Sequence, residues 1–549
     1  MKKILKSLLL AAGVITMAAS CTNAAKMAEA ADKIKIKCNP DVLEAVAGKI
    51  DADVDVTFPE EYFLPKATLE ITPVIIYIGG EVAGKPFMYQ GEKIADNFKS
   101  VSKDGATISE KIHFDFVPGM EKSELVARAK VMYKGNEYTY PADIKIADGV
   151  NNTYTLVDRS GTKFLPMIAD NYQEIIPQKE EAQILYMINS SEVRNSEITS
   201  TGIKNFVNAL KALENDARRT VKGTEIVAYA SPDGAYNLND KLSAAREQSA
   251  KKAFDSVTKT VDAGNVSTRS IAEDWEGFQE LVQASNIEDK ELILRVLSMY
   301  SDPNVREREI RNMSSVYTSL ASEVLPELRR ARFITNVEYA NFTADELTEL
   351  LSNNISALDE EALLRTATLV KDSNAKLAAY KKAITSFDSD RARYNAAVVC
   401  LKDNKDTEAK NFVSSLKDKT TDIYKNILGV IEMRAGNYDK AEKLFNEAGD
   451  ISKANKGVID ILNGKYAEAA HELKGLEDHN AVLANILNGN LTEAAKSIKG
   501  DCPRASYYKA IIAARQGNVT AAKEELEKAC KNEALAERAK TDIEFAKVK

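Results

Sequence analysis

Hydrophobic and polar positions alternate with a period of two through the first part of the chain. Six segments between residues 34 and 160 show this alternation or are rich in β-branched residues: KIKIK, DADVDVTF, ATLEITPVIIYI, EKIHFDF, ELVARAKVMY and NEYTYPADIKI. Turns containing Gly, Pro and Asn separate them, as expected for short strands. The alternate faces carry Lys, Asp and Glu and lack aromatic girdles, so the pattern favours a β-sandwich over a small membrane barrel.

A different pattern begins after residues 161–180, which contain two prolines and a charged QKEE run and are predicted to be a linker. From 181 to 340, apolar strand-like runs alternate with helical periodicity, which predicts an α/β domain. The segment GIKNFVNALKALENDA places its apolar residues on one helical face: Ile203, Phe206, Val207, Leu210 and Leu213. The run EIVAYAS predicts a strand that leads through a Pro-Asp-Gly turn into a helix near Asn239.

Residues 341–549 are predicted to be helical throughout, and they contain an internal repeat. Four segments align without gaps: RAGNYDKAEKLF, LNGKYAEAAHEL, LNGNLTEAAKSI and RQGNVTAAKEEL. Each has a glycine at the turn, a small residue five positions later and a bulky apolar residue four positions further on. The turn glycines are Gly436, Gly464, Gly489 and Gly517. Such helical hairpins bury their faces only by stacking on one another.

The array resembles the tetratricopeptide repeat family. The first repeat carries the resemblance best, through Leu428, Gly429, Gly436, Tyr438, Ala441, Phe445 and Ala448. The later repeats are shorter than the family's usual length of roughly 34 residues. The resemblance implies a groove that receives a protein partner.

The first 21 residues have the pattern of an export signal. A positive start, MKK with Lys6, precedes the apolar run SLLLAAGVITMAA, which is too short to span a bilayer stably. The following small residues and Cys21 resemble a bacterial lipoprotein signal, which implies lipidation of Cys21 and an outer-membrane anchor. Ordinary signal cleavage near Cys21 or Ala24 is the alternative.

The strand–turn–helix at 229–247 resembles the core of the OmpA-like, peptidoglycan-associated domain. Asn239, Leu242, Ser243 and Arg246 match that family's N-x-x-L-S-x-x-R pattern, ILYMINSSEVRNSEI resembles its first strand and loop, and LRRARFITNV resembles its closing strand. The stretch from about 258 to 325 is longer than the family core needs, and it resembles insertions in exported proteins of Bacteroidetes.

This resemblance implies binding to the diaminopimelate residue of the peptidoglycan stem, which carries a carboxylate and an ammonium group. Arg246 would pair the carboxylate, and N–H groups at the start of the helix would share its charge. The family places an Asp at the end of the second strand for the ammonium, but Ser231 stands there in this chain. Asp233 lies two residues further on and is the candidate replacement.

The composition and the motifs argue against nucleic-acid binding, a metal site and enzymatic activity. The formal net charge is −8 and no part of the chain is strongly basic, so nucleic acid is not an expected partner. His113, His471 and His479 have no Cys or acid at metal-ligand spacing, so no metal site is expected. No nucleophile elbow, phosphate-binding loop or dinucleotide fingerprint occurs, so neither an enzyme nor a cofactor is predicted.

The sequence therefore predicts a three-part, non-enzymatic lipoprotein on the periplasmic face of the outer membrane. The parts are a β-sandwich (34–160), an OmpA-like α/β domain with a helical insertion (181–340) and tetratricopeptide-like repeats (341–549). The expected peptidoglycan-binding residues are Ser231, Asp233, Asn239 and Arg246, and the repeats are expected to hold an envelope protein. The alternative is an adaptor subunit of an outer-membrane assembly, transport or secretion machine that does not bind peptidoglycan.

Overall fold

The structure is a computed structural model, and it describes residues 23–287 and 289–548. Contacts divide the chain into two compact units. Unit 1 joins the chain up to Ile168 with the chain from Asp390 onward, and unit 2 is Ala169–Ser389. The α/β domain is therefore inserted between a sandwich and a helical array that belong to one unit. Helices α9–α11 (residues 344–387), which lie within the predicted repeat region at 341–549, are part of unit 2.

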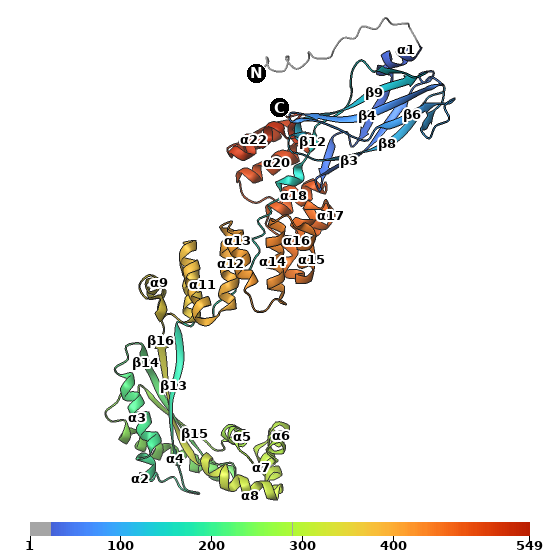
Figure 1. Cartoon of the computed structure of the whole chain (residues 1–549). Coiled ribbons are helices and arrows are strands. Elements are labelled where there is room, and N and C mark those ends of the chain that lie inside the picture. The colour runs from blue at the N-terminus through green and yellow to red at the C-terminus, as the bar shows by residue number, and fades with distance from the viewer. Residues whose placement is uncertain (1–22, 288, 549) are drawn as a thin grey trace. The chain divides into compact units, whose positions relative to one another are not determined.

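The N-terminal part of unit 1 is a sandwich of two sheets around one core (Figure 1). The helix α1 (Asn23–Glu29) precedes it. The five-stranded sheet consists of β1 (Lys35–Asn39), β2 (Leu43–Val46), β3 (Lys49–Phe58), β8 (Ala106–Asp115) and β12 (Val150–Asn151). The seven-stranded sheet consists of β4 (Ala67–Tyr77), β5 (Gly80–Ala83), β6 (Phe87–Gly91), β7 (Lys99–Val101), β9 (Ser123–Tyr133), β10 (Asn136–Thr139) and β11 (Ile144–Asp148).

The predicted alternation appears directly in the burial of β3. Its residues Val54, Val56 and Phe58 are at most 2% exposed and contribute to the core, whereas Asp51 and Asp53 on the other face are exposed. The strand pairs antiparallel with β8 along its whole length, from Lys49 to Phe58. Because one face of the strand is buried, a slip of one residue would bury the aspartates, so the hydrophobic pattern fixes the register.

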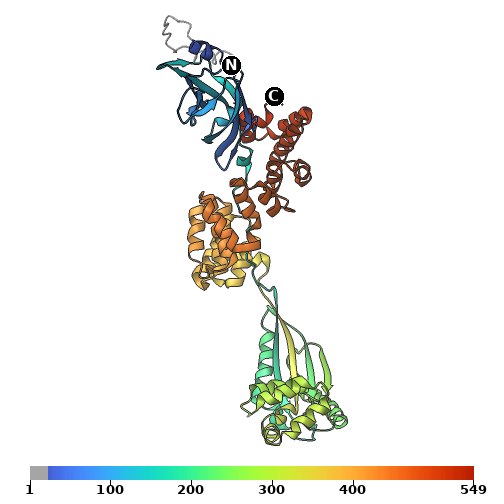
Figure 2. The ribbon, with the colours of Figure 1, turned by 90° about the vertical axis from the view of Figure 1, so that its right-hand side faces the viewer.

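The helical part of unit 1 is a series of antiparallel hairpins (Figures 1 and 2). Its helices are α12 (Asp390–Lys402), α13 (Asp406–Ser414), α14 (Asp422–Arg434), α15 (Tyr438–Ala448), α16 (Lys453–Leu462), α17 (Tyr466–Glu472), α18 (His479–Leu487), α19 (Leu491–Ser497), α20 (Pro503–Arg515), α21 (Val519–Ala529) and α22 (Glu533–Thr541). The small residues predicted between the paired helices, Ala441, Ala469, Ala494 and Ala522, are all fully buried. Of the bulky residues, Phe445 and Leu473 are buried, and Ile498 and Leu526 are half-buried.

The last turn of the chain ties this array to the sandwich. Glu544, whose side chain is 5% exposed, pairs with Arg515 of α20 at 2.6 Å. The same carboxylate accepts hydrogen bonds from Asn151 Nδ2 (2.9 Å) and Thr153 Oγ1 (2.7 Å), at and just after β12. These contacts hold the pKa of Glu544 below its usual value despite its burial. Because its partners satisfy the buried charge, the carboxylate stabilises this junction.

Unit 2 is built on a four-stranded sheet with the order β13 (Ile175–Leu185), β16 (Arg330–Ala340), β14 (Arg219–Tyr229) and β15 (Val266–Ile271). β14 and β15 are parallel, and β16 runs antiparallel to both β13 and β14. α3 (Thr201–Leu213) and α4 (Tyr236–Val257) share one core with the sheet and cover one of its faces. The other helices are α2 (Asn195–Ile198), α5 (Trp275–Ala284), α6 (Lys290–Met299), α7 (Pro303–Asn312), α8 (Ser314–Glu323), α9 (Ala344–Asn353), α10 (Glu360–Leu369) and α11 (Ser373–Phe387).

Two features of unit 2 bear on the sequence predictions. The insertion forms the helices α5–α8, which have a core of their own and gather at one end of the sheet (Figures 1 and 2). The predicted linker at 161–180 is wrong in its second half, because β13 begins at Ile175. This strand lies at the edge of the sheet with one face exposed and the other only half-buried for most of its length. Polar and charged residues therefore stand on both faces, and the apolar alternation of a strand with one fully buried face is missing.

Candidate functional site

The strand–turn–helix predicted from the sequence forms at the carboxyl end of β14. The strand ends at Tyr229, and α4 begins at Tyr236, one turn earlier than expected. Asn239 is 4% exposed and donates from Nδ2 to the carbonyl oxygens of Ser231 (3.2 Å) and Gly234 (2.9 Å). Asn239 therefore fixes the shape of the turn with its side chain.

Three polar side chains meet at this turn. The Ser231 hydroxyl donates to the Asp233 carboxylate, and Arg329 donates to both residues. The distances are 3.3 Å from Arg329 Nη2 to Asp233 Oδ2 and 3.4 Å from Arg329 Nε to Ser231 Oγ. Arg311 of α7 donates to the backbone carbonyl of Asp233. Ser231 and Asp233 thus lie in contact, and Arg329, which was not among the site residues predicted from the sequence, is the cation beside them.

The two consecutive arginines that end the predicted closing motif have separate roles. Arg329 reaches the turn, and its side chain is 14% exposed. Arg330 pairs with Asp274 through Nη2 at 2.8 Å, and both side chains are less than 10% exposed. Asp274 also caps α5 by accepting from the Gly277 amide. The Arg330–Asp274 ion pair is thus buried and links the sheet to the inserted helices, whereas Arg329 contacts the candidate site.

Arg246 lies beneath the turn and is 1% exposed. Its guanidinium donates to three backbone carbonyls: Ser190 (Nε, 2.9 Å), Tyr229 (Nη1, 2.9 Å) and Met187 (Nη2, 3.2 Å). It also stacks on the Tyr186 ring, 4.9 Å from its centroid. Burial lowers the pKa of Arg246 to about 10. In this geometry Arg246 joins the loop after β13 to the end of β14.

The turn holds one acidic and one basic side chain, Asp233 and Arg329, which are the two charges that a small zwitterion would pair with. Open α/β sheets place ligands at the carboxyl ends of their strands, and β14 ends here. Asp233 offers a carboxylate for an ammonium group, and Arg329 offers a guanidinium for a carboxylate. Both side chains are less than 20% exposed, so they interact more strongly than a fully solvated pair.

The helical array contains a fifth hairpin that the sequence alignment missed. Its turn residue is Asn404, whose φ of 58° lies in the left-handed region, as do those of the turn glycines Gly436, Gly464, Gly489 and Gly517 (75° to 83°). Ala409 and Val413 are buried at the positions of the small and bulky residues. Asn tolerates this backbone conformation better than other non-Gly residues, so this hairpin forms the same turn without the glycine that marks the other four.

Residues 156–168, which we call the strap, lie in the groove of the helical array and cross the first helix of each of the five hairpins. The Tyr508 hydroxyl on α20 donates to the Leu156 carbonyl (3.4 Å), and Arg434 on α14 donates to the Ser160 carbonyl (3.2 Å). Lys163 pairs with Asp478 at 2.9 Å. The first half of the predicted linker therefore belongs to the strap.

Two asparagines clamp the strap by its backbone. Asn480 accepts from the Asp158 N–H (2.8 Å) and donates to the Asp158 carbonyl (2.9 Å). Asn395 does the same with Ile168, at 2.8 and 2.9 Å. A side-chain amide matches the donor and acceptor of one peptide residue, so this groove holds an extended backbone with little regard to its side chains. Asn395, Asn480 and Tyr508 each stand nine residues before the turn residue of their hairpin.

Of the other residues named in the sequence analysis, two histidines contact neighbouring side chains, and Cys21 lies outside the described residues. His113 bonds Asp51 at 2.7 Å on an exposed strand face, and His479 lies 3.5 Å from Cys502 Sγ. Within 23–287 and 289–548, no cluster of His, Cys, Asp and Glu is arranged to hold a metal ion. None of the helices in these ranges is long and apolar enough to cross a membrane.

The solved structures that resemble this chain include two distant neighbours. PilF of Pseudomonas aeruginosa is 14% identical over 33% of this chain and 90% of its own, with a TM-score of 0.26. A tetratricopeptide repeat protein of Parabacteroides merdae is 14% identical over 49% of this chain and 99% of its own, with a TM-score of 0.27. No protein-family model matches the sequence, and no curated protein matches it. At these scores neither neighbour assigns a function to this chain.

Proposed function

We propose that this protein is a non-enzymatic lipoprotein of a bacterial outer membrane that links the membrane to peptidoglycan and scaffolds an envelope complex. The observation that carries the proposal is the Asp233–Arg329 pair at the carboxyl end of β14, 3.3 Å apart and next to the first turn of α4. It restores the carboxylate that the OmpA-like pattern lacks at Ser231.

The pair suits the diaminopimelate end of a peptide stem. The ligand's ammonium would replace Arg329 as the partner of Asp233, and its carboxylate would pair with the freed guanidinium. Asp233 and Arg329 are less than 20% exposed, and Ser231 offers a further hydroxyl beside them. Each charged contact stabilises a bound ligand by about 1.5–3 kcal/mol, so loss of one contact lowers affinity about tenfold or more.

Arg246 acts in this proposal as a positioning residue. Its three carbonyl contacts fix Ser190, Tyr229 and Met187 and so hold the end of β14 against the loop after β13. Substitution of Arg246 would disturb the turn itself and would not report on ligand contact alone. Asp233 and Arg329 are therefore the better residues to test.

The other parts complete the scaffold. Lipidation of Cys21 would anchor the chain at the periplasmic face of the outer membrane, and the sandwich would separate the anchor from the rest. The repeats would meet an envelope partner. Because residues 156–168 occupy the groove of the array, we place that partner on another face of the hairpins.

Co-sedimentation of the purified protein with sacculi that contain diaminopimelate tests the proposal. Asp233→Asn and Arg329→Gln should each lower the affinity about tenfold or more. Asp255→Asn and Lys251→Gln make the same charge changes at an exposed pair on α4 and should bind like the wild type. Equal binding by the site variants and their controls would remove Asp233 and Arg329 from the site.

The second candidate function is an adaptor subunit of an outer-membrane machine with no peptidoglycan binding. The engagement of Arg246 with three backbone carbonyls favours it, because in that state the guanidinium is committed to the fold. A wild-type protein that does not sediment with sacculi, yet co-purifies with one stoichiometric membrane protein after mild detergent, would establish this function instead.

A further inference from the structure

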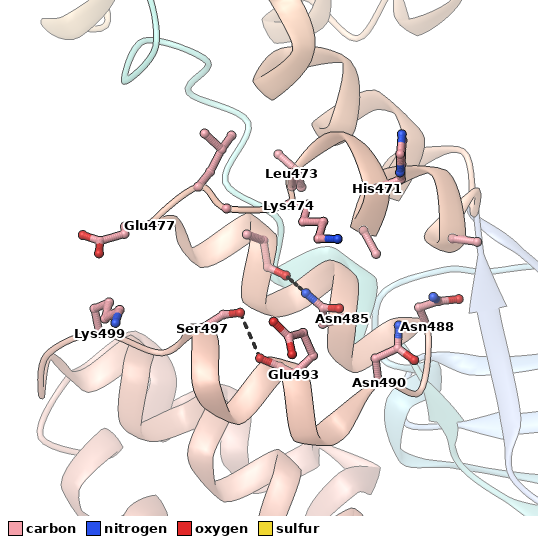
Figure 3. A pocket seen from close by; sticks show the side chains of 15 residues that line it. His471, Leu473, Lys474, Glu477, Asn485, Asn488, Asn490, Glu493, Ser497 and Lys499 are labelled. Carbon is pink, nitrogen blue, oxygen red and sulfur yellow. Dashed lines mark hydrogen bonds between the residues drawn. The ribbon is translucent and has the colours of Figure 1, made fainter.

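Two large cavities of the helical array lie on either side of α17. One, of about 600 Å³, lies between α17, α18 and α19 (Figure 3). Asn485, Glu493 and His471 are among the labelled side chains that line it in Figure 3. The second, of about 580 Å³, lies between α15, α16 and α17, and His471 lines it too. α17 and α19 have seven residues each, against eleven in α15 and α21, so these short second helices leave the first helices partly uncovered.

The second cavity, which we call the Asp460 cavity, opens away from the strap. On α16, Asn455 and Val458 line the strap side, together with strap residues. Lys456 and Asp460 line the cavity. At 100° per residue these two pairs fall on opposite sides of the helix, so a ligand in the cavity would not compete with the strap.

Asp460 is the unusual member of the lining. Its side chain is 2% exposed, and its Oδ2 is buried without a hydrogen-bond partner. An isolated buried carboxylate is costly unless a cation or several donors meet it. A folded protein that keeps one beside a cavity therefore has a place for a positively charged group.

The preceding hairpin shows what Asp460 lacks. Glu432 stands four residues before Gly436, as Asp460 stands four before Gly464. Glu432 accepts from Lys440 Nζ and Asn437 Nδ2, both at 2.7 Å. In the next hairpin, Glu468 stands at the position of Lys440, and Lys465 stands at the position of Asn437. An acid thus replaces the lysine that neutralises the carboxylate.

The cations near Asp460 are already paired. Lys465 Nζ lies 2.6 Å from Glu442 of α15, and Lys456 Nζ lies 2.9 Å from Glu472 of α17. The cavity lining therefore carries four acidic side chains against two lysines and one histidine: Glu442, Asp460, Glu468, Glu472, Lys456, Lys465 and His471. No metal-holding cluster is found among the residues described, here or elsewhere, so an organic cation fits better than a metal ion.

We propose that the Asp460 cavity binds the ammonium group of a lysine side chain presented by a partner protein. The four acidic side chains attract the basic segment, and the ammonium supplies the charged partner that Lys440 gives Glu432 in the neighbouring hairpin. This site lies in unit 1 and does not depend on the site proposed for peptidoglycan in unit 2.

Ligand-observed NMR with the whole protein tests the proposal. The probes are Nα-acetyl-lysine-methylamide, the same compound acetylated at Nε, and putrescine as a free amine. The lysine compound should bind, and its Nε-acetylated form should not. Asp460→Asn should weaken binding of the lysine compound about tenfold or more, because it removes the buried charge. Glu468→Gln removes an equal charge from the rim and should weaken it about twofold at most.

Three results would overturn the proposal. Equal weakening by Asp460→Asn and Glu468→Gln would show general attraction to an acidic surface. Equal binding of the acetylated probe would show that the ammonium is not recognised. Strong binding of putrescine without binding of the lysine compound would indicate a site for a free amine and not for a protein side chain. Circular dichroism should show that both variants fold, since neither removes an existing hydrogen bond of Asp460 Oδ2.

Discussion

Arg246→Ala is the substitution whose effect follows most directly from the structure of unit 2. The change removes hydrogen bonds to the carbonyls of Ser190, Tyr229 and Met187 and leaves them buried without those donors. It also removes a guanidinium stacked on Tyr186. We expect a clear loss of stability in unit 2.

The magnitude comes from two opposing effects. Hydrogen bonds to a charged donor contribute about 1.5–3 kcal/mol each, and the stacked cation contributes about 1 kcal/mol. Removal of the cation also ends its desolvation, and the fall of the Arg246 pKa from 12.5 to about 10 sets this relief at about 3 kcal/mol. The three hydrogen bonds outweigh this relief even at the low end of their range, so unit 2 should lose at least about 2.5 kcal/mol of its free energy of unfolding.

The single tryptophan makes the assay selective. Trp275 lies in unit 2 and packs on Phe278 at a centroid distance of 5.5 Å, so its fluorescence reports the unfolding of this unit during urea titration. The midpoint should fall by at least about 1 M urea. Lys251→Ala, on an exposed part of α4, is the control and should change it little. An Arg246→Ala midpoint equal to that of the control would refute the assignment of Arg246 to the fold.

Three further predictions concern unit 1. Asn480→Ala removes both hydrogen bonds to the strap backbone, so it should lower the free energy of unfolding by about 2 kcal/mol and speed amide hydrogen exchange at residues 157–160. Unchanged exchange at these residues would contradict the role of Asn480 in holding the strap. Gly429→Ala would place a Cβ 2.5 Å from the Phe445 ring of α15, whereas a Cβ at Gly436 meets nothing within 4 Å and strains only the backbone. Gly429→Ala should therefore lower the melting temperature more than Gly436→Ala does. The reverse order would contradict the packing described. Burial raises the pKa of Asp460 from 3.8 to about 6, so its ionisation opposes folding by about 3 kcal/mol above pH 6, and this penalty fades as the pH falls toward 4. Asp460→Asn should therefore exceed the wild type in stability near pH 8 and match it near pH 4 in urea titrations, and an equal difference at both pH values would exclude Asp460 as the cause.

The sequence predicted the elements that bury one face. The alternation in β3 and the helical period of α3 both follow from contact with a single core, and local patterns record such contact well. The strap left no comparable pattern, because its backbone is held by side chains more than 200 residues away, such as Asn395 and Asn480. The predicted linker failed at β13 because the inner face of this edge strand is only half-buried, so polar and charged residues such as Gln178 and Glu180 stand on it and hide the apolar alternation.

In the candidate site, too, local sequence spacing predicted some features, and contacts with distant residues decide the others. The spacing of Ser231, Asp233 and Asn239 within one turn was enough to predict that they lie together. The role of Arg246 was beyond the sequence, because its partners are backbone carbonyls, which no residue type reveals. Arg329 and Arg330 both belong to the predicted closing motif. Only the structure shows that Arg329 pairs with Asp233 at the site and that Arg330 pairs with Asp274.

Competition with free diaminopimelate tests the central claim most directly. The purified wild-type protein is sedimented with sacculi while free meso-diaminopimelate is added, with Asp233→Asn and its control Asp255→Asn alongside. The account predicts that the wild type and the control pellet, that the free amino acid releases them, and that Asp233→Asn stays in solution. Wild-type protein that never pellets, or that pellets without release by diaminopimelate, would contradict the proposed recognition of the peptidoglycan stem.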